Sequence, residues 1–405
     1  MNIRDTLFTL FNVREAHELP AAMMKTIEDP EDLERIRVAY LNSFPDLHHD
    51  YLRDYFEENA ADRSTLKQDY TPDGICQLMS DIIGKRSVVA DICAGSGALT
   101  LSVWDKNPDT IFVCYEKSSS ALPLLLLNLA IRSVNAFVVY GDVLTEEYEA
   151  IYRVKDGTVT KTDEKLPDKV DAVITNPPYS LGWSGQHDLR FGIYPAPPKS
   201  KADYAFVLIG LEMLKENGIL AAILPHGVLF RGSAEGKVRE GLCKDGKIHA
   251  VIGLPEKLFL STGIPTVIAV LSHQKEDGIF FVDASKDFKK GKQQNILCPD
   301  HIHRIWDAFN ARREEPKFSR YIYPAEIEEN DYNLNIPRYV DSFERDPVPD
   351  PFQTLKNLQA ISLDIQKTEK ALMGYIDELV YTGNDKNAAR ELCTIKEEFR
   401  KLVSL

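Results

Sequence analysis

The sequence predicts a doubly wound α/β domain, in which helices cover both faces of a parallel β-sheet. From about residue 65 onward, short apolar segments alternate with segments of helical periodicity. Near-continuous apolar strands separated by helices are typical of a sheet that is buried on both faces. Ligands of such domains bind at the carboxyl ends of the strands. We expect strands at residues 87–92, 111–115, 137–140, 170–175, 219–224, 248–253 and 266–272, and helices at 119–133, 203–216 and 233–243.

The composition is that of a globular protein with enough apolar residues for a full core. Of the 405 residues, 44% are hydrophobic and 27% are charged, which excludes a disordered or collagen-like chain. The formal net charge of −14 excludes a uniformly basic protein that coats nucleic acid, and also a polybasic membrane binder. Residues 1–62 alone carry a net charge of −8, so the rest of the chain leaves room for a local basic cleft.

The six cysteines are scattered along the chain, without the short, repeated spacings of a disulfide framework or a zinc site. No metal is therefore expected. The N-terminus lacks the basic and apolar regions of a signal peptide. The longest apolar stretch, 121–131, is too short to span a bilayer and is interrupted by Asn128. We therefore expect a soluble, reduced, cytoplasmic protein without a membrane partner.

The chain divides into three predicted regions. Residues 1–62 form an acidic helical N-terminal region, in which prolines separate short amphipathic helices. Residues 63–345 form the α/β domain, with two insertions. An Asp-Gly pair between alternating residues predicts a hairpin at 150–165, and the loop at 180–201 is long enough to predict a mobile, functional segment. Residues 346–405 form a helical C-terminal region.

Mostly apolar residues of the C-terminal region recur at alternating steps of three and four, at positions 358, 361, 365, 368, 372, 375 and 379. This heptad seam of about three repeats predicts a coiled coil or a helical bundle. A helix that packs on its own domain is the alternative.

Three successive strands of the predicted sheet end in an acidic residue. The first ends at Asp91 and runs into Gly-Ser-Gly at 95–97, where glycines let the backbone approach a nucleotide-like ligand. The second ends at Glu116, which suits a ribose diol, and the third at Asp142, which could accept a hydrogen bond from an adenine amino group. A structural turn and solvated strand-end carboxylates are the alternatives. Three such strand ends are nevertheless hard to explain by packing alone.

The fourth strand, 170–175, leads directly into Asn176-Pro177-Pro178-Tyr179. Two prolines stiffen this turn, so that the amide oxygen of Asn176 and the carbonyl oxygen of Pro177 can converge on one amino group. Such a pair would bind both N–H protons of adenine N6 and direct its lone pair at an electrophile. Tyr179 offers a stacking face for an extruded base. The alternative is a rigid turn that only ends the strand.

Together these motifs resemble the S-adenosylmethionine-dependent DNA methyltransferases that modify amino groups. The resemblance rests on the loop at 91–99, the Asn-Pro-Pro-Tyr motif and an upstream Gln-Asp-Tyr-Thr-Pro segment at 68–72, whose order is that of the gamma class of N6-adenine enzymes. It covers about residues 65–342. Further stretches resemble the modification (M) subunit of type I restriction-modification systems, at 190–206, 224–232, 253–255 and 332–339.

The resemblance implies a fold, a cofactor and a set of site residues. The domain at 63–345 would have the doubly wound S-adenosylmethionine-dependent methyltransferase fold, between helical extensions, with S-adenosyl-L-methionine as its cofactor. The residues that would contact the cofactor are Tyr70, Thr71 and Pro72 at its methionine, Asp91, Gly95, Ser96, Gly97 and Ala98 along the glycine loop, Glu116 at its ribose and Asp142 at its adenine. The residues that would hold the flipped target adenine are Asn176, Pro177, Pro178 and Tyr179.

The function that the resemblance implies is site-specific methylation of adenine N6 in double-stranded DNA. No separate base-reading domain is apparent, so a DNA specificity subunit docked on the C-terminal helix would choose the sequence, and a restriction subunit could join the complex. The alternatives are a stand-alone phage or mobile-element adenine methylase, a protein-glutamine or RNA-adenine methyltransferase, and a catalytically silent assembly subunit.

The segment Arg-Gly-Ser-Ala-Glu-Gly at 231–236 is a further candidate, for a contact with a phosphate. Arg231 lies beside a predicted helix start at Ser233, and helix N-termini favour anions such as phosphate. A simply capped helix start is the alternative.

Overall fold

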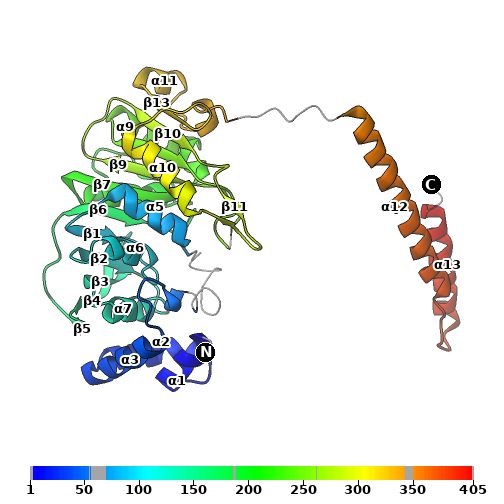
Figure 1. Ribbon diagram of the computed structural model, residues 1–405, viewed down its shortest axis with the longest axis horizontal. Coiled ribbons are helices and arrows are strands. Elements are labelled where there is room, and N and C mark those ends of the chain that lie inside the picture. Colours follow the sequence, from blue (N-terminus) through cyan, green and yellow to red (C-terminus); the bar gives the residue numbers. More distant parts are fainter. Residues whose placement is uncertain are drawn as a thin grey trace. The chain divides into compact units, whose positions relative to one another are not determined.

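The computed structural model describes residues 3–53, 55, 70–185, 188–260, 262–342 and 350–403. The chain forms two compact units, Met1–Ser342 and Phe343–Leu405. The first unit is built on a large sheet with helices on both faces (Figure 1), and the second is a pair of helices. Among the described residues, no helix is both long enough and apolar enough to cross a lipid bilayer.

Within the described ranges, the large sheet has eleven strands, which include all seven that the sequence predicts. They are β1 (Val88–Asp91), β2 (Ile111–Glu116), β3 (Asn135–Asp142), β4 (Glu147–Lys155), β5 (Thr158–Lys161), β6 (Val170–Thr175), β7 (Leu214–Pro225), β8 (Ile248–Gly253), β9 (Thr266–Ser272), β10 (Ile279–Asp283) and β13 (Ser319–Ile322). Their spatial order is β13-β10-β8-β9-β7-β6-β1-β2-β3-β4-β5. A separate small sheet pairs β11 (Lys289–Lys290) with β12 (Asn295–Ile296).

The sheet is mixed, so the prediction of a wholly parallel sheet was wrong. β3, β2, β1, β6 and β7 are parallel neighbours, but β9 lies antiparallel between β7 and β8, and β4 and β13 are antiparallel to their neighbours. The described residues between β8 and β9 form no helix, and a parallel return would need a crossover. Strands buried on both faces have the same apolar pattern in either direction, so the sequence does not show this reversal.

Helices on the two faces of the sheet enclose two apolar cores. One face is covered by α5 (Asp73–Ile83), α6 (Ala98–Lys106), α7 (Leu122–Ile131) and α10 (Pro299–Ala311). The other is covered by α8 (Asp203–Glu212), α9 (Ser233–Lys244) and α11 (Pro324–Glu329). Alternate strand residues, such as Val89 and Ala90 of β1, enter opposite cores. The sheet is therefore doubly wound, as predicted.

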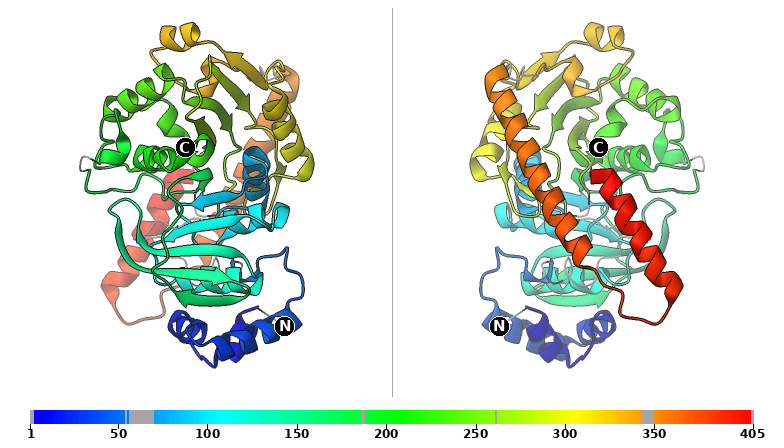
Figure 2. Two further views of the ribbon diagram at one scale, coloured as in Figure 1. Left: turned by 90° about the vertical axis from the view of Figure 1, so that its left-hand side faces the viewer. Right: turned by 90° about the vertical axis from the view of Figure 1, so that its right-hand side faces the viewer.

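The N-terminal helices belong to the first of these cores. They are α1 (Ile3–Phe11), α2 (Leu19–Ile27) and α3 (Pro30–Ser43). Both α2 and α3 contact α7, and α3 also contacts β5 at the edge of the sheet. Figure 2 shows this group of helices beyond the β4–β5 edge.

Two local predictions concern connections at the amino ends of β3 and β6. The hairpin predicted at 150–165 is present, because β4 and β5 pair around Asp156 and Gly157, whose φ angles of 50° and 79° suit an Asp-Gly turn. The helix predicted at 203–216 ends at Glu212, because the chain enters β7 at Leu214.

The chain reverses its winding at β1. It winds outward from β1 through β2 and β3, whereas β6 lies on the other side of β1 and leads to β7. The loops after β1 and β6 therefore diverge at the carboxyl ends of these strands, which is where ligands of doubly wound sheets bind.

The second unit consists of α12 (Pro351–Glu378) and α13 (Lys386–Val403). The two helices contact each other, and Arg400 of α13 pairs with Asp377 of α12 at 2.6 Å. The helix predicted for the heptad seam is present in α12. Its apolar side chains are exposed, including Leu358, Ile361 and Ile365 at 52–61%. That this seam docks a partner stays a prediction.

Candidate active site

A cavity of about 470 Å³ opens at the carboxyl ends of β1, β2, β3 and β6, where the sheet reverses its winding. The loops after these four strands form most of its wall. Eleven of the fourteen predicted site residues line it: Tyr70, Thr71, Gly95, Ser96, Ala98, Glu116, Asp142, Asn176, Pro177, Pro178 and Tyr179. The structure thus gathers motifs that are far apart in the sequence.

Three of the predicted residues, Pro72, Asp91 and Gly97, do not line this cavity. Pro72 is the N-cap of α5 and lines a smaller neighbouring cavity of about 270 Å³. Asp91 is fully buried below the glycine loop, where it accepts a hydrogen bond from Thr100 Oγ1 at 2.8 Å. Gly97 begins α6 with a φ of 99°, and a Cβ there would lie 3.0 Å from Leu125. Residues 68 and 69 of the predicted upstream motif lie outside the described residues.

The glycine loop has open space at Gly95 and a buried, unsatisfied polar group at Ser96. Gly95 has a φ of 57°, and a Cβ placed on it would meet nothing within 4 Å. Ser96 is buried, and its hydroxyl has no hydrogen-bond partner among the residues that the structure describes. A buried hydroxyl of this kind on a cavity wall can be satisfied by a bound polar ligand.

Glu116 at the end of β2 is fixed by backbone donors. Its carboxylate accepts hydrogen bonds from the N–H groups of Gly95 at 2.7 Å and Ser118 at 2.6 Å. Burial raises the pKa of Glu116 above its usual value, although these N–H groups oppose the shift. The carboxylate therefore joins the β1 and β2 loops at the cavity.

Asp142 at the end of β3 is held by one backbone donor and one cation. Its Oδ1 accepts from the N–H of Leu144 at 2.8 Å, and its Oδ2 pairs with Lys117 Nζ at 2.6 Å. Lys117 lines the cavity but was missed by the sequence analysis. Its position directly after the strand-end acid Glu116 is the signal that could have found it.

The side chain of Asn176 is held between two other residues of the cavity wall. Its Nδ2 donates to Thr71 Oγ1 at 2.9 Å, and its Oδ1 accepts from the Tyr179 hydroxyl at 2.8 Å. The Tyr179 ring packs edge to face on Phe259, with the ring centroids 5.9 Å apart. Phe259 is buried and lies between β8 and β9. The sequence analysis missed it, because an apolar residue in an apolar run has no signal of its own.

The loop predicted to be functional, 180–201, follows this motif and forms part of the wall. The Trp183 ring N–H donates to the backbone oxygen of Pro198 at 2.9 Å, and the Ala202 N–H donates to that of Leu181 at 2.8 Å. These bonds tie the two ends of the loop together. Its residues that line the cavity are Leu181, Gly182, Trp183 and Ser184.

The prediction that Ser233 caps a helix was wrong, and the phosphate contact of the segment 231–236 stays a prediction. The guanidinium of Arg231 forms ion pairs of 2.7 Å with both Asp203 and Glu235, whose side chains are buried. The N-cap of α9 is Gly232, without a side-chain hydrogen bond, rather than Ser233. Arg231 therefore connects α8 with α9, and its charge is already balanced.

The fold and the cavity define the class of this protein. The architecture is that of the class I S-adenosylmethionine-dependent methyltransferases, which confirms the predicted fold class. A putative member of that class from Listeria monocytogenes matches with a TM-score of 0.53 and 18% identity, over 76% of this chain and 98% of that one. The chain belongs to the N-6 DNA methylase family, whose sequence profile matches residues 44–347.

Its relatives confirm the resemblance to type I modification subunits. The type I restriction enzyme MpnII methylase subunit of Mycoplasma pneumoniae is 31% identical over 366 residues, covering 83% of this chain and 65% of that protein. The type I restriction enzyme MjaVIII methylase subunit of Methanocaldococcus jannaschii is 28% identical over 355 residues, covering 82% of this chain and 59% of that protein. This chain thus spans less than two thirds of the length of these two relatives. The crystal structure of a type I restriction-modification methyltransferase subunit from Streptococcus thermophilus matches with a TM-score of 0.62 and 29% identity. The match covers 84% of this chain and 91% of that one.

Proposed function

We propose that this chain transfers a methyl group from S-adenosyl-L-methionine to N6 of adenine in double-stranded DNA, as the modification subunit of a type I restriction-modification complex. The observation that carries the proposal is that the Asn176 amide lies on the wall of the same cavity as Gly95, Glu116 and Asp142. An amino group bound by Asn176 would therefore lie beside a nucleoside held by the strand ends. The names of the relatives support the same reaction.

The cavity suits this cofactor in size and chemistry. Its volume of about 470 Å³ is within the range of small-molecule sites. A carboxylate has about four acceptor positions, so Glu116 can bind ribose hydroxyls in addition to its two backbone donors, and Asp142 can accept from the adenine amino group. The Ser96 hydroxyl would find its missing partner in the bound molecule. When bound, the cofactor supplies an electrophilic methyl group.

The Asn176 motif would hold a target adenine that has rotated out of the duplex, a step that costs a few kcal/mol. Asn176 Oδ1 and the Pro177 carbonyl would accept the two N6 protons, which directs the nitrogen lone pair toward the methyl group. The hydrogen bond that Oδ1 accepts from the Tyr179 hydroxyl at 2.8 Å helps to fix the orientation of the amide. The Tyr179 ring, fixed by Phe259, would provide the stacking face.

The second unit is the proposed docking element for a DNA specificity subunit. The heptad seam of α12 exposes Leu358, Ile361, Ile365 and Leu372, and a partner helix could bury them. A restriction subunit is a further proposed partner, because the relatives are named as subunits of restriction enzymes.

Methyl transfer from tritium-labelled S-adenosyl-L-methionine tests the proposal. The chain, alone and with a type I specificity subunit, is offered DNA, RNA and a protein release factor in parallel. We expect label in DNA, recovered as N6-methyladenine, when the specificity subunit is present. Label in RNA or protein would contradict the proposed substrate. Transfer to DNA by the chain alone would indicate a stand-alone methylase, and cofactor binding without transfer would indicate a silent subunit.

A further inference from the structure

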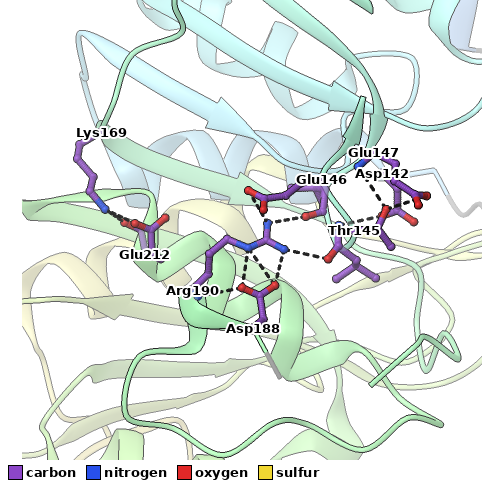
Figure 3. Close-up of polar contacts among 10 residues, drawn as sticks. Asp142, Thr145, Glu146, Glu147, Lys169, Asp188, Arg190 and Glu212 are labelled. Atoms are coloured by element: carbon purple, nitrogen blue, oxygen red, sulfur yellow. Dashed lines mark hydrogen bonds and ion pairs between the residues drawn. The ribbon is translucent and has the colours of Figure 1, made fainter. Parts of the chain in front are cut away.

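Arg190 belongs to the loop 180–201, and its side chain reaches the turn that follows β3 (Figure 3). Its Nη1 donates to the backbone oxygen of Val143 at 2.7 Å, and its Nη2 donates to that of Leu144 at 2.9 Å. The side chain is 15% exposed and does not itself line the cavity. One guanidinium group therefore holds two successive carbonyl groups that lie more than 40 residues earlier in the chain.

Asp188 fixes the guanidinium in this position. Its carboxylate accepts from Nε at 3.0 Å and from Nη2 at 2.5 Å, and it also accepts from the backbone N–H of Arg190 at 2.9 Å at the start of the short helix η2 (Leu189–Phe191). Glu146 Oε1 lies 3.7 Å from Nη1. Burial alone would lower the pKa of Arg190, but hydrogen bonds to Asp188 and the charges of both carboxylates raise it. The group therefore stays charged.

The turn that Arg190 holds carries the carboxylate of Asp142. The N–H of Leu144 donates to Asp142 Oδ1 at 2.8 Å, and the N–H of Glu146 donates to the backbone oxygen of Asp142 at 2.9 Å. Residues 142–145 all line the cavity. A displacement of Leu144 would therefore move the Asp142 carboxylate and this part of the wall together.

The other end of the link is the loop that continues from the Asn176 motif. Phe191, next to Arg190 in the chain, is 1% exposed and packs edge to face on Trp183, with centroids 5.7 Å apart. Trp183 lines the cavity. Arg190 thus connects the wall after β6 with the wall after β3.

We infer that Arg190 is a positioning residue that sets the shape of the adenine end of the cofactor cavity, an inference that rests on the proposed function. Only a planar group with several donors can serve Val143, Leu144 and Asp188 together, so lysine cannot replace it. Without the guanidinium, the carbonyl groups of the buried residues Val143 and Leu144 would lose these two donors, and the turn at 142–146 would rearrange to find others.

The binding of two cofactor fragments tests this role. S-adenosylhomocysteine contains both ends of the cofactor, whereas 5′-methylthioadenosine lacks the amino acid end. In Arg190→Gln and Arg190→Lys, we expect the Kd of both ligands to rise by the same factor, about tenfold, because the lost support acts on the end that both share. We also expect faster hydrogen exchange of the Leu144 and Glu146 amides in the ligand-free variants.

Lys169→Gln is the matched control. It removes an ion pair of 2.6 Å with Glu212, neither residue of which lines the cavity (Figure 3), and it should leave both Kd values unchanged. Unchanged affinity for both ligands in folded Arg190 variants would overturn the inference, as would a loss confined to S-adenosylhomocysteine. If the wild-type chain binds neither ligand, the cofactor assignment fails, and hydrogen exchange still decides whether Arg190 holds the turn. If Arg190→Gln does not fold, Arg190→Lys, which keeps the charge, gives the same test.

Discussion

The Nδ2 group of Asn176 donates a hydrogen bond of 2.9 Å to the hydroxyl of Thr71, which lies 105 residues earlier in the chain. Thr71 is buried in the segment just before α5. The bond therefore joins the two halves of the proposed site, one for the methionine end of the cofactor and one for the target base. A partner on the amide nitrogen also directs the amide oxygen, which would accept a proton of the target amino group.

This relationship predicts a role for Thr71 that is separate from stability. Thr71→Val keeps the shape of the side chain but removes the acceptor, so kcat for methyl transfer should fall about tenfold. Thr71→Ser keeps the hydroxyl and should retain most of the rate. Steady-state methyl transfer with saturating cofactor measures both variants. Equal rates for the valine and serine variants would show that the hydroxyl does not orient Asn176.

Asp91 predicts a dependence of stability on pH. Burial raises its pKa from 3.8 to about 7. Between these values the folded protein keeps a proton that the unfolded chain has released. The contribution of Asp91 to the free energy of unfolding is therefore complete below pH 3.8 and is lost as the pH rises from there through about 7. Asp91→Asn removes the titration. Relative to wild type, its free energy of unfolding should improve by about 2–3 kcal/mol between pH 5 and pH 8. Urea unfolding measures this change, and a difference that does not vary with pH would refute it.

Asn128 predicts a large structural effect below the glycine loop. It interrupts the otherwise apolar α7, where its Nδ2 donates to Asp50 Oδ1 at 3.0 Å and to the Ser96 carbonyl at 2.9 Å, and its Oδ1 accepts from Arg132 at 2.9 Å. Each buried group left without its partner costs about 1–3 kcal/mol, so Asn128→Leu should lower the free energy of unfolding by about 2–4 kcal/mol. Chemical denaturation provides the measurement.

The control for Asn128 is Lys165→Ala. Lys165 forms an ion pair with Asp168 in which both side chains are more than three quarters exposed, so its loss should change the free energy of unfolding by less than about 0.5 kcal/mol. Equal effects of the two substitutions would show that the network around Asn128 contributes no more than a surface pair.

The positions of the strands could be predicted from the sequence more completely than the directions in which they run in the sheet, such as that of the antiparallel β9. The predicted strands at 170–175 and 266–272 agree to the residue with β6 and β9, because charged residues or turns bound each apolar run. β10 is equally buried but was not predicted. No helix separates it from β9, so the alternation of strands and helices that guides the prediction is absent there.

The site motifs could also be predicted, but not the contacts that support them. The position of Glu116, Asp142 and Asn176 at strand ends is sufficient to place them at one cavity. Asp91 also ends a strand, yet its side chain points into the protein and pairs with Thr100 of α6. Arg190 reaches Val143 only through the path of the loop that carries it. Such long-range contacts leave no local pattern in the sequence.

The measurement that tests the central claim most directly is modification-detecting single-molecule sequencing of DNA. A methylation-free host expresses the chain with a type I specificity subunit, and a parallel culture carries Asn176→Ala. The account predicts N6-methyladenine at one DNA motif in the first culture and a loss of at least about 100-fold in the second, because a positioned acceptor is removed from the reacting amino group. N6-methyladenine at the same motif and level in the Asn176→Ala culture would contradict it.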